Sequence, residues 1–353
     1  MTVDSSRAKP VAKIDAPARR MERLAAEFED ELRCFIEVKS RGGTENLHDA
    51  MAFALGADID DPAQRGKRLR PVLCLLTADS LGADRDLAMP FAMAIELMHN
   101  FALVHDDIED GDVMRRGRDA VWVRYGQPHA INIGDYLLVN TVEVLTNWGP
   151  PTLSPATRLE LLRLITSALD HTHVGQALDM NYRGRRGLTV EEYLRIVREK
   201  TGYYLAAPIQ GGAIVAGAAR ETLETIAQMA QFLGPMFQII DDIIDLTDGK
   251  GREAIGSDIR EGKRSYLVAH VSERGSPAER DRLFDILDRP RSETSPEEVE
   301  EARAIFDRTG AIEAGRGFCR DLHDQSRQLL ARLPESLGRP LGEVFERLVE
   351  RNH

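Results

Sequence analysis

Several features that would assign this chain to a large class of proteins are missing from its sequence. No run of 18 or more apolar residues occurs, and the first twenty residues are polar and basic, so we expect neither a membrane span nor a secretory signal. A cytosolic protein is therefore expected. Strand patterns of alternating β-branched residues between turns are nearly absent, which predicts an all-α fold.

Cysteine is also rare. The three cysteines are far apart in the sequence and lack metal-ligand spacing, so a disulfide framework or a zinc site is not expected. We expect reduced thiols that take part in packing: Cys34, Cys74 and Cys319.

Basic residues are fewer than acidic ones. The chain has 46 Lys and Arg against 58 Asp and Glu, which gives a formal net charge of −12 and a pI near 5.3. Binding to a nucleic-acid backbone needs a basic face, so no nucleic-acid partner is expected. Any anionic substrate must meet cations that are clustered locally.

What the chain does have is helical periodicity along most of its 353 residues. Residues 1–17 are polar and are expected to form a flexible N-terminal arm, with residues 18–353 as a single domain. The polar stretch 289–301 is short enough to be a connector within that domain. Helices are predicted over 18–40, 45–56, 68–81, 85–110, 128–148, 154–182, 190–218 with a break near 201–202, 221–248, 276–288, 296–309, 311–333 and 338–350.

Three of these segments are apolar around most of the helix circumference. They are Ala88–Val104, Ala130–Leu145 and Ala227–Ile244. A helix that is apolar on every side is normally surrounded by other helices. We therefore expect these three to be central helices of the bundle.

Two acidic clusters with the same pattern follow two of these apolar segments. Residues 106–110 read DDIED and residues 241–245 read DDIID. On a helix the first and fifth positions share one face, so two or three carboxylates from each cluster can converge on one set of ions. Oxygen ligands of this kind suit Mg2+, which binds through a few carboxylates together with substrate phosphates.

The alternative interpretation is a pair of solvated helix ends. Each cluster lies in the last turns of its helix. The negative end of the helix dipole disfavours carboxylates there by on the order of 0.3 kcal/mol or more. Because two clusters lie in such unfavourable positions, a site in which bound cations neutralise the carboxylates is favoured over solvated helix ends. An EF-hand loop does not fit, because Ile108 occupies a position that needs an oxygen ligand.

Compact basic groups stand out in this acidic chain. Residues 65–71 read RGKRLRP, and Arg115-Arg116, Lys200 and Lys263-Arg264 follow. Arginine binds diphosphate oxygens through two parallel hydrogen bonds and lysine supplies a point charge, so a site for two diphosphates needs this inventory.

Taken in order, these groups resemble the motif series of the trans-isoprenyl diphosphate synthases over roughly residues 60 to 270. The motifs are 66–71 (GKRLRP), 99–100 (HN) with 106–110, 115–117 (RRG), 134–135 (GD), 175–176 (GQ) with Asp179, 200–202 (KTG), Gln238 with 241–245, and 256–258 (GSD) with 262–264 (GKR). The resemblance implies the isoprenoid synthase fold, a bundle of long antiparallel helices around a central cavity, usually in a homodimer.

The resemblance also implies roles for particular residues. About three Mg2+ ions around the allylic diphosphate would be held by Asp106, Asp107, Asp110, Asp241, Asp242 and Asp245. The allylic diphosphate itself would be bound by Arg115, Lys200 and Lys263. Isopentenyl diphosphate would be bound by Lys67, Arg70, His99 and Arg116.

Two further residues, Thr201 and Gln238, would face the developing allylic cation with their oxygen dipoles and count, with Lys200 and Arg115, among the catalytic residues. The chain departs from the family where a Gly-Lys pair usually precedes Gly256. Arg252 lies there instead and is a candidate replacement for that lysine.

Product length should depend on what blocks the cavity as the hydrocarbon grows. Phe101 lies five residues before Asp106, about one and a half turns deeper, and is followed by the small Ala102. In the resemblance, this arrangement points to the twenty-carbon geranylgeranyl diphosphate. A plain core aromatic is the alternative interpretation of Phe101, and a farnesyl or longer product remains open.

Two rival functions share some of these features. A class I terpene cyclase ionises a single diphosphate and usually has a different second metal motif, which is not found here. A non-catalytic subunit of a heteromeric prenyl synthase would tolerate degraded aspartate motifs, whereas both motifs are intact. The sequence therefore favours a Mg2+-dependent prenyltransferase that condenses isopentenyl diphosphate with an allylic diphosphate.

Overall fold

The protein is a bundle of helices, which confirms the all-α prediction. The computed structural model describes residues 17–59, 65–66, 68–246 and 255–350, and within them the only strands are the two-residue β1 (Met114–Arg115) and β2 (Arg118–Asp119), paired antiparallel. The helices of the first half are α1 (Pro17–Ser40), α2 (His48–Ala54), α3 (Leu69–Ser80), α4 (Arg85–Asp110), α5 (Val121–Tyr125), α6 (Gln127–Asn147) and α7 (Pro155–Tyr182).

The second half of the chain is also helical. It contains α8 (Val190–Val197), the π-helical turn η1 (Arg198–Gly202), α9 (Tyr203–Val215), α10 (Arg220–Gln228), α11 (Ala230–Asp245), α12 (Ser257–Arg260), α13 (Tyr266–Arg274), α14 (Pro277–Leu287), the 3-10 turn η2 (Arg291–Glu293), α15 (Pro296–Arg308), α16 (Ala311–Leu330) and α17 (Glu335–Glu350). Proline or a capping Ser or Thr begins several of them, as at Ser154-Pro155, Thr189 and Ser295-Pro296.

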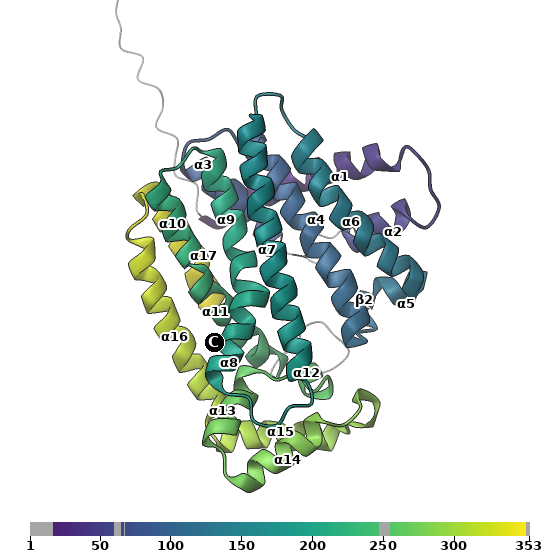
Figure 1. Ribbon diagram of the computed structural model, residues 1–353, viewed down its shortest axis with the longest axis vertical. Coiled ribbons are helices and arrows are strands. Elements are labelled where there is room, and N and C mark those ends of the chain that lie inside the picture. The colour runs from purple at the N-terminus through teal and green to yellow at the C-terminus, as the bar shows by residue number, and fades with distance from the viewer. Residues whose placement is uncertain (1–16, 60–64, 67, 247–254, 351–353) are drawn as a thin grey trace, which may run out of the picture.

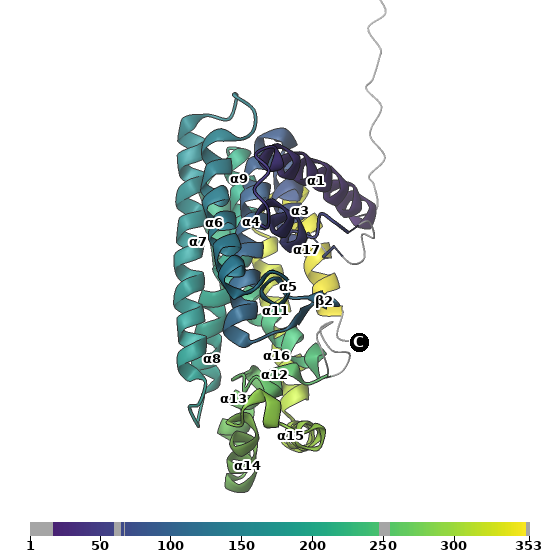
Figure 2. The ribbon, with the colours of Figure 1, turned by 90° about the vertical axis from the view of Figure 1, so that its right-hand side faces the viewer.

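The long helices run side by side (Figure 1). Helix α4 packs against α3, α6 and α9, and α7 packs against α9 and η1. Seen from the side, α6 and α7 form one outer face, with α1 and α3 opposite and α4, α9 and α11 between (Figure 2). Helices α14 and α15 cover one end of the bundle, near the ends of α4 and α11 that carry the acidic clusters.

Helix α4 is the one helix in the described part of the chain that is long and apolar enough to cross a membrane. Its most apolar window is 72% buried inside the protein. Its apolar surface is therefore covered by neighbouring helices, as in the core helix of a folded bundle.

One predicted helix is divided in two. The sequence predicts a continuous helix over 221–248, but α10 ends at Gln228 and α11 begins at Ala230. Pro235 has no backbone N–H to donate to the turn before it, and the Ala230 carbonyl lies against η1, 2.3 Å from where a Gly202 Cβ would be. The interruption at Met229 lies next to the contact between Ala230 and η1. The last residues predicted in this helix, 247–248, lie outside the described residues.

Several short elements are present that the sequence did not predict. The β1–β2 hairpin, α5, α12 and α13 were not predicted. Helix α13 had a readable signal, since the Ser265 side chain accepts a hydrogen bond from the Val268 N–H and begins an apolar run. The others are shorter than two turns and depend on tertiary contacts.

Two of the three helices predicted to be central, α4 and α11, are indeed surrounded, but α6 is not. Large apolar side chains are exposed on α6 and its neighbours α5 and α7, whereas elsewhere in the described chain only Ile255 is so exposed. The residues are Val123, Ile131, Val139, Val142, Leu159, Val174 and Met180. The apolar circumference of α6 is therefore partly a surface.

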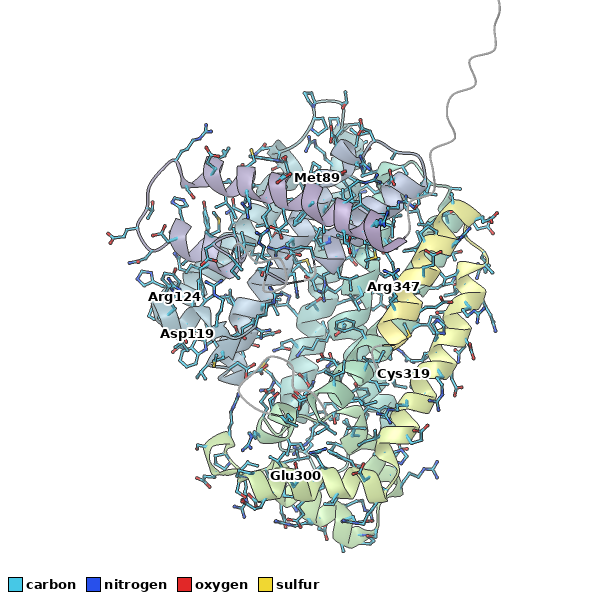
Figure 3. All side chains as sticks on the ribbon, turned by 180° about the vertical axis from the view of Figure 1, so that it is seen from behind. Met89, Asp119, Arg124, Glu300, Cys319 and Arg347 are labelled. Carbon is cyan, nitrogen blue, oxygen red and sulfur yellow. The ribbon has the colours of Figure 1, made fainter. Side chains whose placement is uncertain are left out.

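The cysteines are free, and two of them are buried. Cys74 packs under α4, and Cys319 on α16 is seen from behind in Figure 3. Burial raises the pKa of Cys319 to about 12, so the thiol stays protonated at neutral pH. The prediction of packed thiols is wrong for Cys34, which is exposed.

The predicted break near residues 201–202 is the π-helical turn η1, and three glycines allow its close packing. A Cβ on Gly175 would lie 2.1 Å from the Lys200 nitrogen, and a Cβ on Gly234 would lie 2.6 Å from the Gly202 nitrogen. Only glycine permits backbones to approach so closely. The turn places Lys200 and Thr201 on the cavity described next.

Candidate active site

A cavity of about 400 Å3 lies between α4, α7, η1 and α11. A second hollow of about 130 Å3 continues from it toward Lys263. The two share several charged and polar lining residues, so they form one continuous site: Asp106, Arg115, Lys200, Gln238 and Asp241.

Both acidic clusters contribute carboxylates to this site. Asp106 and Asp110 lie on one face of α4 and line the hollow, as their spacing predicts, and Asp241 of α11 lines it from the other side. Burial raises the pKa of Asp106 to about 6, although the positive charge of Lys200 opposes the shift. Oxygen donors from two helices thus face one space.

The other three aspartates are held by neighbouring side chains. Asp107 accepts a hydrogen bond of 2.6 Å from Arg115 Nε. Asp242 accepts from Tyr193 Oη at 2.9 Å and Lys263 Nζ at 2.8 Å. Asp245 accepts from Ser257 Oγ at 2.6 Å and from the Asp258 N–H at 3.0 Å, so its carboxylate lies at the beginning of α12.

Carboxylates that could bind a cation are therefore spread over the walls. In the described part of the chain no group of three or more His, Cys, Asp or Glu side chains forms a ready-made metal site. This arrangement fits Mg2+, which binds through one or two carboxylates plus phosphate oxygens and water instead of an all-protein cage.

Cations face the same hollow. Lys200 Nζ lies 2.9 Å from Asp179 Oδ2, and Lys263 Nζ bridges Asp242 and Asp258. Burial alone would lower the pKa of Lys200, but the carboxylates of Asp179 and Asp106 raise it overall. Both ammonium groups therefore stay charged within reach of an anionic ligand.

Two further cations, Arg70 and Arg116, line the 400 Å3 cavity but not the smaller hollow. Arg70 Nη1 lies 3.2 Å from His99 Nε2 and its guanidinium is 4.5 Å from the centre of the Tyr204 ring. Arg116 lines the same wall and donates to the Arg65 carbonyl at 3.2 Å. Lys67, also predicted here, lies outside the described residues, as does Arg252.

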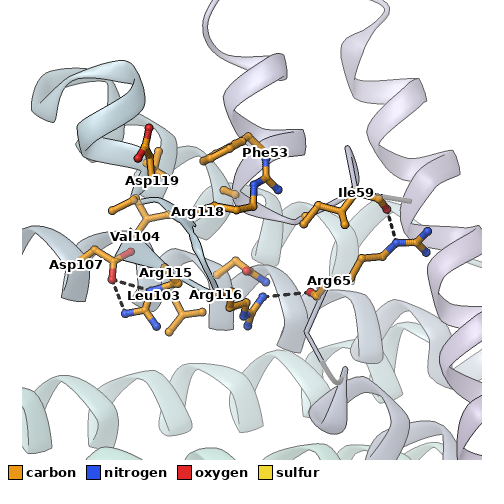
Figure 4. A pocket seen from close by; sticks show the side chains of 15 residues that line it. Phe53, Ile59, Arg65, Leu103, Val104, Asp107, Arg115, Arg116, Arg118 and Asp119 are labelled. Atoms are coloured by element: carbon orange, nitrogen blue, oxygen red, sulfur yellow. Dashed lines mark hydrogen bonds and ion pairs between the residues drawn. The ribbon is translucent and has the colours of Figure 1, made fainter. Parts of the chain in front are cut away.

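A smaller pocket of about 50 Å3 behind α4 shows how these arginines are supported (Figure 4). Arg115 points to Asp107, and Arg116 points to the backbone of Arg65. Gly66, with φ of +92°, leaves room for the Arg116 guanidinium, 2.7 Å from where its Cβ would be. A side chain at position 66 would displace Arg116.

Phe101, which is 5% exposed, lines the cavity together with Met98, Ala102 and Leu103. The Phe101 ring stacks on the His173 ring, with 5.9 Å between the ring centroids. It also makes an edge-to-face contact with the His105 ring, with 4.9 Å between centroids. His105 contacts the Ile131 carbonyl at 3.3 Å. Thr201 and Gln238 line the cavity wall, and Gln238 Nε2 donates to Asp242 at 3.1 Å.

Sequence reasoning missed Arg183. This arginine follows α7, lines the hollow and lies 2.5 Å from Asp110 Oδ1. The available signal was its position four residues after Asp179, on the same helical face. The hydrogen bond of 2.5 Å from Gln176 to Glu109 was also unforeseen.

His99 should remain neutral at pH values well below those at which a histidine side chain normally protonates. Burial lowers its pKa well below 6.5, and Arg70 lowers it further. In the unfolded chain the imidazole protonates near its ordinary value, so lowering the pH through about 6.5 favours the unfolded state. A nitrogen-15 NMR titration of the ligand-free protein should find His99 neutral at pH 6, and Arg70→Gln should raise its midpoint. A His99 midpoint at or above its ordinary value would contradict this.

Comparison with known proteins agrees with these features. Residues 59–306 match the family model described as Polyprenyl synthetase. A short chain isoprenyl diphosphate synthase of Methanothermobacter thermautotrophicus is 35% identical over 291 residues, covering 82% of this chain and 87% of the relative. A geranylgeranyl pyrophosphate synthase of Geoglobus acetivorans is 36% identical over 293 residues, with 82% and 88% covered.

Solved structures show the same fold. A geranylgeranyl pyrophosphate synthetase from Pyrococcus horikoshii superposes with a TM-score of 0.82 at 29% identity, covering 95% of this chain and 98% of that one. A polyprenyl synthase from Caulobacter crescentus, complexed with calcium and isoprenyl diphosphate, gives 0.81 at 26% identity, with 97% and 99% covered. The chain therefore belongs to the polyprenyl synthetase family, and it is a prenyltransferase with the all-α isoprenoid synthase fold.

Proposed function

We propose that the protein elongates an allylic diphosphate by head-to-tail addition of isopentenyl diphosphate, with Mg2+ as cofactor. The observation that supports this most directly is that two sets of phosphate-binding side chains line one site. Lys200, Lys263 and Arg115 line the smaller hollow with the carboxylates, whereas Arg70, Arg116 and the neutral His99 line the larger cavity but not the hollow. Two diphosphates need two such sets, whereas a cyclase with one diphosphate has no use for the second.

About three Mg2+ ions are proposed to bind between Asp106, Asp110 and Asp241 and the allylic diphosphate. Asp107, Asp242 and Asp245 complete these clusters and hold Arg115, Lys263 and α12 in place. When bound, Mg2+ supplies Lewis-acid stabilisation of the diphosphate leaving group.

The chain's own residues would carry the other parts of the reaction. Lys200 and Arg115 neutralise charge that develops on the leaving diphosphate. The Thr201 hydroxyl and the Gln238 amide oxygen face the allylic cation, because the Gln238 amide nitrogen is already directed to Asp242. The apolar walls around Phe101 keep water from the cation, and the departing diphosphate accepts the proton that is lost.

Geranylgeranyl diphosphate is the proposed product. The Geoglobus acetivorans and Pyrococcus horikoshii relatives carry that name, and Phe101 and the small Ala102 both line the cavity, where Phe101 is proposed to limit product length. Farnesyl or longer products remain the alternative outcomes of the assay below.

Phe101→Ala should lengthen the product. Removing the ring takes away the side chain proposed to block the growing hydrocarbon beside His173, so the product can grow beyond twenty carbons. Chromatographic sizing of the products from a fifteen-carbon starter is expected to reveal longer prenyl diphosphates than the wild type makes. Phe318→Ala, on α16 against Tyr266, is the matched control and should leave product length unchanged. Unaltered products from Phe101→Ala would mean that Phe101 does not limit product length.

A homodimer is proposed to form through the exposed apolar face of α5, α6 and α7. Of the eight large apolar side chains exposed in the described residues, seven lie on these three helices. Exposed apolar side chains concentrated on neighbouring helices are typical of a surface that binds another protein. A sedimentation measurement that finds only monomer at micromolar concentration would contradict the dimer.

Residues 18–353 are proposed to act as one domain in the cytosol. Of the N-terminal arm predicted over 1–17, residues 1–16 lie outside the described residues and Pro17 begins α1. Buried apolar side chains form a single cluster from Leu24 to Phe345. A protease that cuts the folded chain into two stable halves would contradict one domain.

The function can be tested with purified protein, Mg2+, isopentenyl diphosphate and, separately, five-, ten- and fifteen-carbon allylic diphosphates. Elongation of each starter to a common product is expected. Cyclic hydrocarbon from an allylic diphosphate alone would instead support a terpene cyclase. Activity that appears only after a second synthase chain is added would support a non-catalytic subunit.

A further inference from the structure

Arg183 has a place in the site that the functions assigned above do not use. It is the residue that follows α7, and its side chain enters the 130 Å3 hollow between the two acidic clusters. Its Nη2 lies 2.5 Å from Asp110 Oδ1 and 3.9 Å from Asp179 Oδ2. The side chain is 26% exposed, so the pair is only partly shielded from solvent.

The guanidinium has donors that are not used. Arginine carries five N–H groups in a planar fork, and the Asp110 carboxylate accepts from one end of it. Arg183 Nε is buried and has no hydrogen-bond partner among the described residues. A buried donor without an acceptor costs about 1–3 kcal/mol, so its retention in a ligand pocket indicates an acceptor that arrives with a ligand.

The partner of Arg183 is also informative. Asp110 is one of the three carboxylates proposed above to bind Mg2+ directly, and Arg183 covers its Oδ1. A divalent cation and a guanidinium compete for the same oxygen. If Mg2+ takes Asp110, the Arg183 guanidinium is released next to the space proposed for the diphosphate.

We propose that Arg183 is an exchangeable counter-ion of the site: it neutralises Asp110 in the free protein and binds diphosphate oxygens once Mg2+ occupies Asp110. The proposal rests on the proposed function, because it assumes that Mg2+ and a diphosphate bind in this hollow. The arginine fork matches phosphate oxygens through two parallel hydrogen bonds, which a lysine cannot reproduce. Arg183 thereby adds a diphosphate contact from the residue after α7 to those from η1 and the segment before α13.

Calorimetric titration of wild type and Arg183→Gln with inorganic diphosphate at saturating Mg2+ tests this. Loss of the charged contact should weaken diphosphate binding by about 10- to 100-fold. Titration with Mg2+ alone should give equal or tighter binding in Arg183→Gln, because Asp110 has lost its competitor. Arg183→Lys, which keeps the charge but not the fork, should fall between the two in diphosphate affinity and guards against misfolding of the glutamine variant.

Arg186→Gln is the matched control. Arg186 lies three residues later and pairs with Asp285 and Asp288 outside the hollow, so its loss should leave diphosphate affinity unchanged. If Arg183 were only a structural partner of Asp110, its removal would leave diphosphate binding equal or tighter, and that result would overturn the proposal. Wild type that binds no diphosphate with Mg2+ would instead overturn the proposed function as well, so the two failures are distinguishable.

Discussion

Asp106→Asn is expected to lower kcat/KM for elongation by at least about 100- to 1000-fold. Asp106 lines both parts of the site, and its carboxylate faces Asp241 across the space proposed for the metal and the leaving diphosphate. Asparagine has nearly the same shape but no negative charge, so the fold should be kept while the electrostatic support of the metal is lost. Steady-state assays over a range of Mg2+ concentrations would measure the effect.

The control for this substitution is Asp321→Asn. Asp321 is an exposed aspartate on α16, far along the chain from both clusters. Its substitution should change kcat/KM by less than about twofold, in line with ordinary surface substitutions. Near wild-type activity of Asp106→Asn at all Mg2+ concentrations would contradict the assignment of α4 as a metal-binding helix.

Arg68→Met is expected to lower the free energy of unfolding by about 3–5 kcal/mol. Arg68 is 4% exposed and donates to Glu29 and Glu96 at 2.6 Å each, and also to the Leu55 carbonyl. Removing the guanidinium leaves the carboxylate of Glu96, which is 2% exposed, buried without its partner cation. The ion pairs through which Arg68, at the start of α3, connects α1 and α4 would also be lost.

Denaturant unfolding at fixed protein concentration would measure this change. The double variant Arg68→Met with Glu96→Gln should recover part of the loss, because it removes the uncompensated charge. Arg320→Met is the matched control: its pair with Glu313 is exposed, and such pairs contribute roughly 0–1 kcal/mol. A loss from Arg68→Met no larger than the control's would contradict a structural role for Arg68.

Much of the fold could be predicted because long helices carry their signals locally. Helix α4 was predicted with its bounds, since an apolar run ends at Gly111, which adopts φ of +68° after the last turn. The division between α10 and α11 could not be predicted in this way. It depends on the approach of Ala230 to η1, a contact between segments that are distant in the sequence.

The site was predicted to a similar degree. The spacing of Asp106 and Asp110 on one helix face follows from helix geometry alone. Helix geometry does not reveal which carboxylates remain available to a ligand. That depends on pairs between distant residues, such as Arg183 and Asp110, which are 73 residues apart. Arg68 lies in the same basic motif as Arg70 yet faces the interior, which the pattern of charges did not reveal.

The surface of the bundle was the least predictable part. An apolar helix can be covered by its own chain or by a second copy, and hydrophobic periodicity is the same in both cases. Helix α6 was therefore expected in the centre, although Val139 is 64% exposed.

The central claim is that this cavity joins isopentenyl diphosphate to an allylic diphosphate. Its most direct test is mass spectrometry of the product from fifteen-carbon allylic diphosphate, Mg2+ and uniformly carbon-13-labelled isopentenyl diphosphate. A twenty-carbon prenyl diphosphate in which one five-carbon unit carries the label is expected. An unlabelled product, or no product under conditions in which the protein is folded, would contradict it.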